Sequence, residues 1–304
     1  SGRDARGPNH EFDSPDAHGH RTYTNDMGVY LRPRRLEEAL SALARPSAQP
    51  HTVLAGGTDF YPARVGRAID EDVLDIGGID VLRGITADAA GWRLGATTTW
   101  TELFEADLPP LFDGLKQAAR EVGGRQIQNA GTLAGNICNA SPAADGVPAL
   151  LAPDADVEIA GTAARRLPLR QFITGVRRTV LASGELVVAI HVPRPRHDAE
   201  SAFLKLGARR YLVISIAMAA ATLEFAEGCV VAARVAVGAC SPVAERLPAL
   251  ESALVGAPRD QLADRVDVAQ LAPLAPIDDV RGSASYRRDA VVTLLRRLLM
   301  GFAR

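Results

Sequence analysis

The chain has 304 residues, of which 47% are hydrophobic and 23% charged, and its formal net charge is −2 at pH 7. This composition is typical of a soluble globular protein with two or three modest domains, and a charge so close to zero argues against nucleic acid or a membrane surface as its partner. The three cysteines, Cys138, Cys229 and Cys240, form no CxxC pair, which argues against disulfides, zinc or a cysteine-ligated iron–sulfur cluster in this chain and favours a reducing cytoplasm.

The first 26 residues are polar, rich in Gly, Pro, Asp and His, and show no periodicity. They predict a disordered leader or a tag over 1–26, with Met27 as a plausible original start. His18 and His20 could contact a metal, but two histidines in such a segment are expected to be solvated. The longest apolar run, Tyr211–Phe225, is too short to cross a bilayer.

Residues 27–84 predict a small α/β unit. A helix is expected over Pro33–Ala44, because Pro33 suits a first turn and the apolar residues recur at helical spacing. Strands are expected at His51–Ala55 and Asp72–Ile76, each followed by a glycine pair.

Residues 85–196 predict a middle α+β unit of short strands and helices. Thr99-x-x-Glu102 is a capping box that opens a short helix, and Asp113 is expected to cap the next one. The remaining elements are strands at Trp92–Ala96, Ala155–Ala160 and Glu185–Val192, and a helical turn at Pro148–Leu151.

Residues 197–304 predict a sheet-plus-helix domain that follows a Pro-rich linker at Pro193–His197. Its many alanines blur the strand alternation, which suggests a sheet covered on one face by helices. The last helix is expected to turn its four arginines, Arg287, Arg288, Arg296 and Arg297, outward. The elements are antiparallel strands at Phe203–Leu206, Val213–Phe225 and Cys229–Ala239, and helices at Val243–Leu254 and Ser285–Met300.

Two segments of small residues carry the signal for function. Asn129–Asp145 reads NAGTLAGNICNASPAAD, and Ala55–Asp59 reads AGGTD directly after an apolar run. Tight loops with little side-chain bulk expose backbone N–H groups that can bind an anion, so the two segments suggest two sides of one phosphate-bearing ligand. Neither has the G-x-G-x-x-G spacing of a Rossmann site or the G-x-x-x-x-G-K-[ST] of a P-loop, so loops rather than one helix N-terminus would hold the ligand.

No Ser/His/Asp or Cys/His arrangement for nucleophilic catalysis is indicated. His51 and His191 lie in expected strands beside apolar residues, where a histidine is more often a core or edge residue than a base. Cys138 lies beside Ile137 and is interpreted as a small apolar filler.

The two segments resemble those of the flavin-binding subunit of the xanthine dehydrogenase family of molybdenum hydroxylases, whose medium subunits are similar in carbon monoxide dehydrogenase and nicotinate dehydrogenase. Two further stretches agree: Glu185–Pro193 is similar to the strand that approaches the flavin ring, and Phe203-x-Lys205-x-x-x-Arg209-Arg210 is similar to the start of the family's C-terminal domain. The resemblance runs in order over about residues 28–302.

This resemblance implies an α+β chain with a vanillyl-alcohol-oxidase-like (PCMH-type) FAD-binding fold and a C-terminal three-stranded antiparallel sheet with helices. FAD would lie between the first two units. Backbone N–H groups of the first segment would wrap the pyrophosphate, the second segment would close on it, and Asp145 would bind a ribose hydroxyl. Val187 would cover the open flavin face, and Lys205 would lie near the polar edge of the ring. The implied FAD-binding residues are Val53, Leu54, Ala55, Gly56, Gly57, Thr58, Asp59, Thr132, Gly135, Asn136, Asp145, Val187 and Lys205.

Ala134 departs from the family's pattern, because this position is commonly Gly in such loops. If the residue needs a positive φ, its methyl group costs about 1 kcal/mol; otherwise the methyl group is harmless.

The function implied by the resemblance is that of an oxidoreductase subunit with no catalytic residue or metal of its own. It would take electrons from two [2Fe–2S] clusters on a small partner subunit and pass them to NAD, O₂ or another acceptor, while a large partner subunit carries molybdopterin. A cytoplasmic dimer of heterotrimers is the expected assembly. The substrate and the terminal acceptor are not encoded in these residues.

Two alternatives are open from the residues alone. The first is a self-standing FAD reductase of the enolpyruvyl-sugar type, which would need its own proton donor and would be reoxidised by an enolpyruvyl sugar nucleotide. The second is a non-catalytic assembly subunit, which would be colourless even with its partners.

Overall fold

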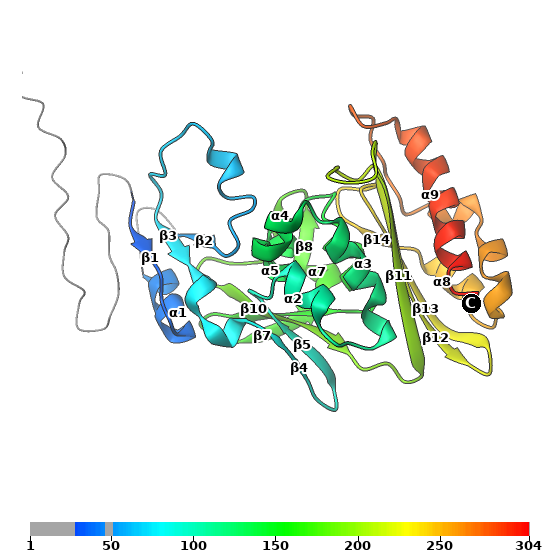
Figure 1. The fold of residues 1–304 in the computed structure, drawn as a ribbon, viewed down its shortest axis with the longest axis horizontal. Helices are drawn as coiled ribbons and strands as arrows, with labels where there is room; N and C mark the ends of the chain where they lie inside the picture. Colours follow the sequence, from blue (N-terminus) through cyan, green and yellow to red (C-terminus); the bar gives the residue numbers. More distant parts are fainter. Residues whose placement is uncertain (1–27, 46–50, 304) are drawn as a thin grey trace, which may run out of the picture.

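The computed structural model describes residues 28–45 and 51–303. The predicted leader at 1–26 and Met27 lie outside these residues. The chain runs through three parts in order, an N-terminal unit, a central part and a C-terminal sheet with helices (Figure 1).

The N-terminal unit contains a parallel three-stranded sheet in the order β1-β3-β2. Helix α1 begins after Arg35, whose backbone is extended, so the prediction that Pro33 lies in its first turn is wrong. Glu38 Oε2 accepts from the backbone N–H groups of Arg34 and Arg35 at 3.1 and 3.3 Å, which satisfies N–H groups at the helix start. The elements are β1 (Tyr30–Leu31), α1 (Leu36–Ala44), β2 (Thr52–Leu54) and β3 (Val73–Asp75).

The central part contains an antiparallel five-stranded sheet in the order β4-β5-β10-β6-β7. The predicted capping box at Thr99 and Glu102 is present and opens helix α2. The strands are β4 (Ile85–Ala87), β5 (Gly91–Gly95), β6 (Asp156–Ala160), β7 (Arg165–Pro168) and β10 (Leu186–Pro193), and a separate hairpin is formed by β8 (Ile173–Gly175) and β9 (Arg178–Thr179). The helices are α2 (Trp100–Glu105), α3 (Asp113–Glu121), α4 (Arg125–Ala130), α5 (Leu133–Asn139), α6 (Gly146–Leu151) and α7 (Leu169–Phe172).

The C-terminal sheet has four antiparallel strands rather than the predicted three, in the order β11-β12-β13-β14. The extra strand occupies the start of the predicted helix Val243–Leu254, and the helix begins only at Pro248, since proline suits a first helical position. The elements are β11 (Asp198–Leu206), β12 (Ala217–Ala226), β13 (Cys229–Gly238), β14 (Glu245–Arg246), α8 (Pro248–Leu254) and α9 (Ala284–Met300).

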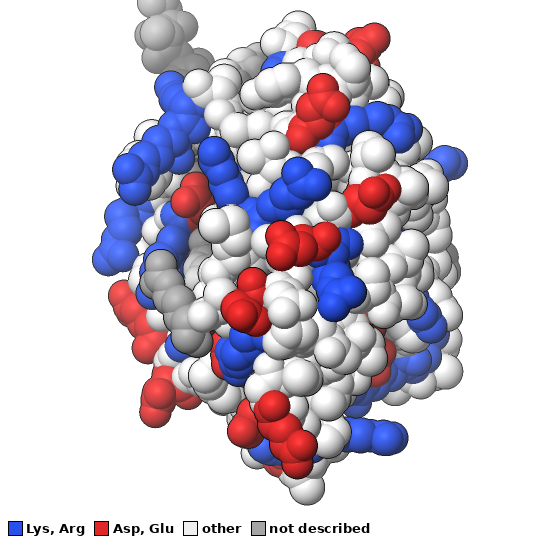
Figure 2. All heavy atoms as spheres, turned by 90° about the vertical axis from the view of Figure 1, so that its right-hand side faces the viewer, with Lys and Arg blue, Asp and Glu red and all other residues white. Residues whose placement is uncertain are grey.

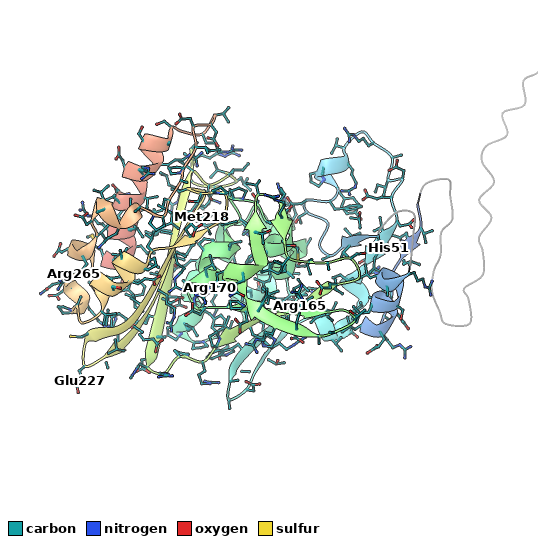
Figure 3. The ribbon with its side chains drawn as sticks, turned by 180° about the vertical axis from the view of Figure 1, so that it is seen from behind. His51, Arg165, Arg170, Met218, Glu227 and Arg265 are labelled. Atoms are coloured by element: carbon teal, nitrogen blue, oxygen red, sulfur yellow. The ribbon has the colours of Figure 1, made fainter. Side chains whose placement is uncertain are left out.

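Both faces of this sheet are buried, so the prediction that helices cover only one face is wrong. Along β12, Ala217, Ala219 and Leu223 pack with α8 and α9, whereas Met218 and Ala220 belong to the core of the central part. Figure 1 shows the sheet between these two helices and the central helices, and Met218 is labelled at this boundary in Figure 3. Small side chains on both faces allow helices to approach the strand closely, which explains the run of alanines in β12.

Three clusters of buried apolar residues accompany the three larger sheets. The N-terminal cluster also includes Leu186 and Val188 of β10, while Val187 and Ile190 of the same strand join the central cluster. A register shift between Val187 and Ala189 accompanies this change of face. Strand β10 is therefore shared by the two cores. The domain boundaries expected at 84/85 and 196/197 stay predictions.

The surface over the C-terminal part carries acidic and basic side chains side by side (Figure 2), as expected for a chain of nearly balanced charge. Within the described ranges, the helices are all too short or too polar to cross a bilayer.

Candidate functional site

The first glycine segment, Ala55–Asp59, follows β2 as expected. A Cβ atom on Gly56 would lie 1.8 Å from the carbonyl oxygen of Ala130, so this segment presses directly on the second one. Gly57 has a φ of +72°, which L side chains rarely adopt. Glycine is therefore required at the two positions for different reasons: Gly56 contacts another backbone segment closely, and Gly57 has a left-handed conformation.

The backbone N–H groups of Gly56, Gly57, Thr58 and Asp59 donate to no acceptor within the described part of the chain. Adjacent donors without protein partners form an anion-binding concavity. These four groups lie at the wall of a cavity and give it donors for a negatively charged ligand.

The second segment is not the open loop that the sequence predicts. Residues Leu133–Asn139 form helix α5, and the Thr132 hydroxyl caps it by accepting from Gly135 N at 3.1 Å. Ala134 is helical, donates its N–H to Ala96 O at 3.3 Å and has no positive φ. Its methyl group therefore causes no backbone strain. The local signal for this helix was the N-cap Thr132 ahead of an apolar turn, which the small residues obscured.

Asn136 contributes an acceptor without a donor. Its Oδ1 atom is buried and makes no hydrogen bond to any residue that the structure describes. Gly146 packs against it, since a Cβ there would lie 2.7 Å from Oδ1. An unpaired buried oxygen costs free energy, and a ligand hydroxyl or N–H group could remove that cost.

Asp145 and Lys205 form a buried ion pair beside Ser215. Lys205 Nζ lies 2.7 Å from Asp145 Oδ2, with the two side chains 6% and 8% exposed, and Ser215 Oγ donates to Asp145 Oδ1 at 2.6 Å. Burial raises the pKa of the Asp145 carboxyl, while Lys205 and Ser215 oppose the rise. The sequence assigned Asp145 and Lys205 to separate parts of the cofactor, whereas the structure joins them in one group drawn from the turn before α6, from β11 and from the segment before β12.

A cavity of about 840 Å³ connects these features. Both glycine segments, Val187 of β10 and the Asp145–Lys205 pair all line it. Val187 itself is only 2% exposed. The residues predicted for the site that line this cavity are Val53, Leu54, Ala55, Gly56, Gly57, Thr58, Asp59, Thr132, Gly135, Asn136, Asp145, Val187 and Lys205.

The sequence missed several other residues of the cavity wall. Leu212, Val213 and Ile214 line it from the segment that joins β11 to β12, because β12 begins at Ala217 and not at Val213 as predicted. Leu212 has a φ of +52°, which is incompatible with a strand. Also unpredicted are Phe60, Arg64, Gln126, Ile127, Asn139, Ser141, Arg177 and Leu181.

The structure describes the surroundings of His191, His51 and Cys138, and their lack of a catalytic role stays a prediction. His191 Nε2 lies 2.7 Å from Glu158 Oε2 on the central sheet, and His51 precedes β2. Burial raises the pKa of the Cys138 thiol to about 12, which makes it a poor nucleophile. Throughout residues 28–45 and 51–303, no three His, Cys, Asp or Glu side chains group as a metal site would require.

Two protein-family models match the chain. Residues 22–195 match the one described as FAD binding domain in molybdopterin dehydrogenase, and residues 202–301 match the CO dehydrogenase flavoprotein C-terminal domain.

Among curated proteins, the chain is similar to the xanthine dehydrogenase FAD-binding subunit of Escherichia coli O157:H7, with 31% identity over 282 residues, or 90% of this chain and 95% of that protein. It is 32% identical to the carbon monoxide dehydrogenase medium chain of Afipia carboxidovorans, over 88% of this chain and 94% of that one. Among solved structures, a chain of reconstituted CO dehydrogenase from Oligotropha carboxidovorans superposes with a TM-score of 0.83 at 27% identity, over 92% of this chain and 99% of that one.

Proposed function

This chain belongs to the family of FAD-binding subunits of xanthine and carbon monoxide dehydrogenase-type molybdenum hydroxylases, and we propose that it carries electrons from [2Fe–2S] clusters of a partner subunit to NAD, O₂ or another acceptor. It is an oxidoreductase subunit whose bound FAD supplies the redox chemistry. The observation that carries the proposal is the single cavity that both glycine segments, Val187 and Lys205 line.

The residues of the cavity fit FAD. At about 840 Å³ the cavity lies in the range of cofactor sites. The unused N–H groups of Gly56–Asp59 suit a pyrophosphate, and a Cβ on Gly57 would crowd the Tyr61 ring beside this concavity. Asn136 Oδ1, which lacks a donor among the described residues, suits a hydroxyl of the cofactor.

The second segment would act on the pyrophosphate mainly through side chains. The N–H groups of Leu133, Ala134, Gly135 and Asn136 all donate within the protein, so they are not available to a phosphate. The Thr132 hydroxyl can still donate, because accepting from Gly135 leaves its proton free.

The buried ion pair of Asp145 and Lys205 retains free hydrogen-bonding positions for the cofactor. Each oxygen of Asp145 accepts one hydrogen bond from the protein and retains a second lone pair for a hydroxyl group of the cofactor. Lys205 uses one N–H for Asp145 and another for Glu121 O at 3.4 Å, so a third remains for the polar edge of the flavin. A cation there would stabilise negative charge on the ring, while Val187 would exclude water from one face.

The partners follow from the family. We propose a large subunit with molybdopterin and a small subunit with two [2Fe–2S] clusters, assembled as a dimer of heterotrimers in the cytoplasm. The match of both family models and of nearly the whole length of the medium chains supports this assignment over a self-standing reductase.

The proposal is tested by purifying the chain with its co-expressed partners. We expect one spectrum with flavin and iron–sulfur bands, and we expect NAD or O₂ reduction to stop when FAD is removed, while the clusters are still reduced by the complex's substrate. Unchanged acceptor reduction in the flavin-free complex would contradict the proposal, and a colourless complex would support an assembly role.

A further inference from the structure

Arg287 of α9 is a buried cation that is not among the described residues that line the cofactor cavity. The sequence predicts it to face outward with the other arginines of α9, but its side chain is only 3% exposed. Its Nη1 donates to the carbonyl oxygens of Ile216 at 2.5 Å and Ala239 at 3.0 Å, and its Nη2 donates to Asp279 Oδ1 at 2.6 Å. One guanidinium thus binds two backbone carbonyls and one carboxylate from three segments of the C-terminal part.

The first of these contacts leads to the ion pair. Ile216 follows Ser215, whose hydroxyl donates to Asp145, and its own N–H donates to Leu206 O at 2.8 Å. Leu206 in turn follows Lys205, the other partner of Asp145. Ile216 is therefore next to Ser215 in sequence and is hydrogen-bonded to the residue after Lys205, and Ser215 and Lys205 are the two partners of the Asp145 carboxylate. Arg287 binds the carbonyl oxygen of Ile216.

The second contact leads to the same carboxylate from another direction. Ala239 has a left-handed φ of +61°, and its N–H donates to Pro142 O at 2.9 Å. Pro142 lies in the turn between α5 and α6 that ends at Asp145. By holding the Ala239 carbonyl, Arg287 supports the turn that carries Asp145.

From these contacts we infer that Arg287 is a positioning residue for the FAD site, which sets the placement of Asp145 and Lys205 from outside the cavity. The inference rests on the proposed contact of that ion pair with the cofactor. A guanidinium is required because its fork can reach acceptors in several directions at once, which a lysine ammonium on a single flexible stem cannot do with the same geometry. Asp279 compensates the buried charge.

The test compares Arg287→Lys with Arg288→Lys in the purified complex. Arg288 is the next residue of α9 and donates to a single carbonyl, Leu274 O at 2.9 Å, away from the cavity. We expect Arg287→Lys to raise the Kd for FAD about tenfold, the scale of a lost charge-assisted hydrogen bond, and to shift the flavin reduction potential to more negative values. Arg288→Lys should change neither. A lower melting temperature with unchanged FAD affinity and potential would show a merely structural role and overturn the inference.

A double-mutant cycle that combines Arg287→Lys with Ser215→Ala tests whether Arg287 acts on Asp145 through Ser215. If Arg287 acts through Ser215, the two changes together should weaken FAD binding less than the sum of their separate effects; additive effects would overturn that route. If Arg287→Lys does not fold, Asp279→Asn replaces it, because this change removes the carboxylate that pairs with Arg287. We expect a smaller rise in the Kd for FAD and a smaller negative shift of the flavin potential, and the absence of both would overturn the inference. Failure of the proposed function is distinguishable, because it would appear as acceptor reduction that persists in the flavin-free wild-type complex, whatever the FAD affinity of the Arg287 variants.

Discussion

The two glycine segments that border the cavity have similar compositions but use their backbones in opposite ways. In Gly56–Asp59 the N–H groups find no acceptor in the described protein, whereas in Leu133–Asn136 every N–H group already donates to a protein oxygen. The first segment can therefore bind an anion with its backbone and the second cannot. Small residues in a sequence indicate that a backbone comes close to something, but not whether that neighbour is a ligand or another part of the chain.

The contact between the segments explains the difference. Gly56 abuts Ala130, and Gly131 lies near the Thr58 hydroxyl, 3.4 Å from a Cβ added there. The second segment folds into a capped helical turn and forms a rigid floor. The first segment lies on that floor and keeps its donors free.

The largest expected effect comes from Gly56→Ala. The new Cβ would lie 1.8 Å from Ala130 O, and because this oxygen belongs to the backbone and no side chain can rotate away, the segments must separate. We expect the complex to retain little or no FAD, measured as flavin per chain after denaturation. Gly66→Ala is the control, because Gly66 lies in the same loop with nothing within 4 Å of its Cβ, and this variant should retain FAD. Full FAD occupancy in Gly56→Ala would mean that the contact between the segments does not matter.

The ion pair provides a contrasting prediction, since it depends on charge rather than on close backbone contact. Lys205→Met leaves the Asp145 carboxylate buried without its cation, and breaking a buried pair in this way costs about 3–5 kcal/mol. Urea unfolding of the variant should show this loss. The double variant Lys205→Met with Asp145→Asn should recover most of it, and equal destabilisation of single and double variants would contradict the assignment.

The cost of Lys205→Met should depend on pH. Burial raises the pKa of Asp145 already in the wild type, and loss of Lys205 removes a group that opposes the rise. A carboxyl whose pKa is higher in the folded than in the unfolded chain binds protons more tightly when folded, so its contribution to stability falls as pH rises from about 4, the unfolded pKa, through the folded value. The gap in unfolding free energy between wild type and Lys205→Met should therefore be larger at pH 7 than near pH 4.5. A gap that narrows on raising the pH would contradict this sign.

The sequence predicted the parts of the site that depend on neighbours along the chain. The position of Ala55–Asp59 after a strand and the start of α2 at the Thr99 capping box were both predicted, because each signal is contained in a few consecutive residues. The Asp145–Lys205 pair joins residues sixty positions apart, and no local pattern specifies which buried lysine meets which carboxylate.

The misplacement of Arg287 has a similar cause. Helical periodicity sorts residues by polarity, so an arginine is placed on the outer face. In the structure two carbonyls and a carboxylate from distant segments satisfy this arginine inside the protein. Likewise, the alanines of β12 predicted a strand but not a sheet buried on both faces, since the second face is covered by helices from the central part.

Gly57→Ala should give the smallest of these effects and sharpen the comparison between the segments. The change places a methyl group at a φ of +72°, which costs about 1 kcal/mol. The new Cβ would lie 2.6 Å from the ring of Tyr61, which is 56% exposed and can move aside, and 3.5 Å from Leu54 Cδ1, an ordinary contact. Gly66→Ala, at a φ of +76°, should lose the same stability. Only Gly57→Ala should also weaken FAD binding, because only there do the unused N–H groups shift. Equal FAD affinity in the two variants would show that the geometry of this segment, unlike its contact with Ala130, does not determine binding.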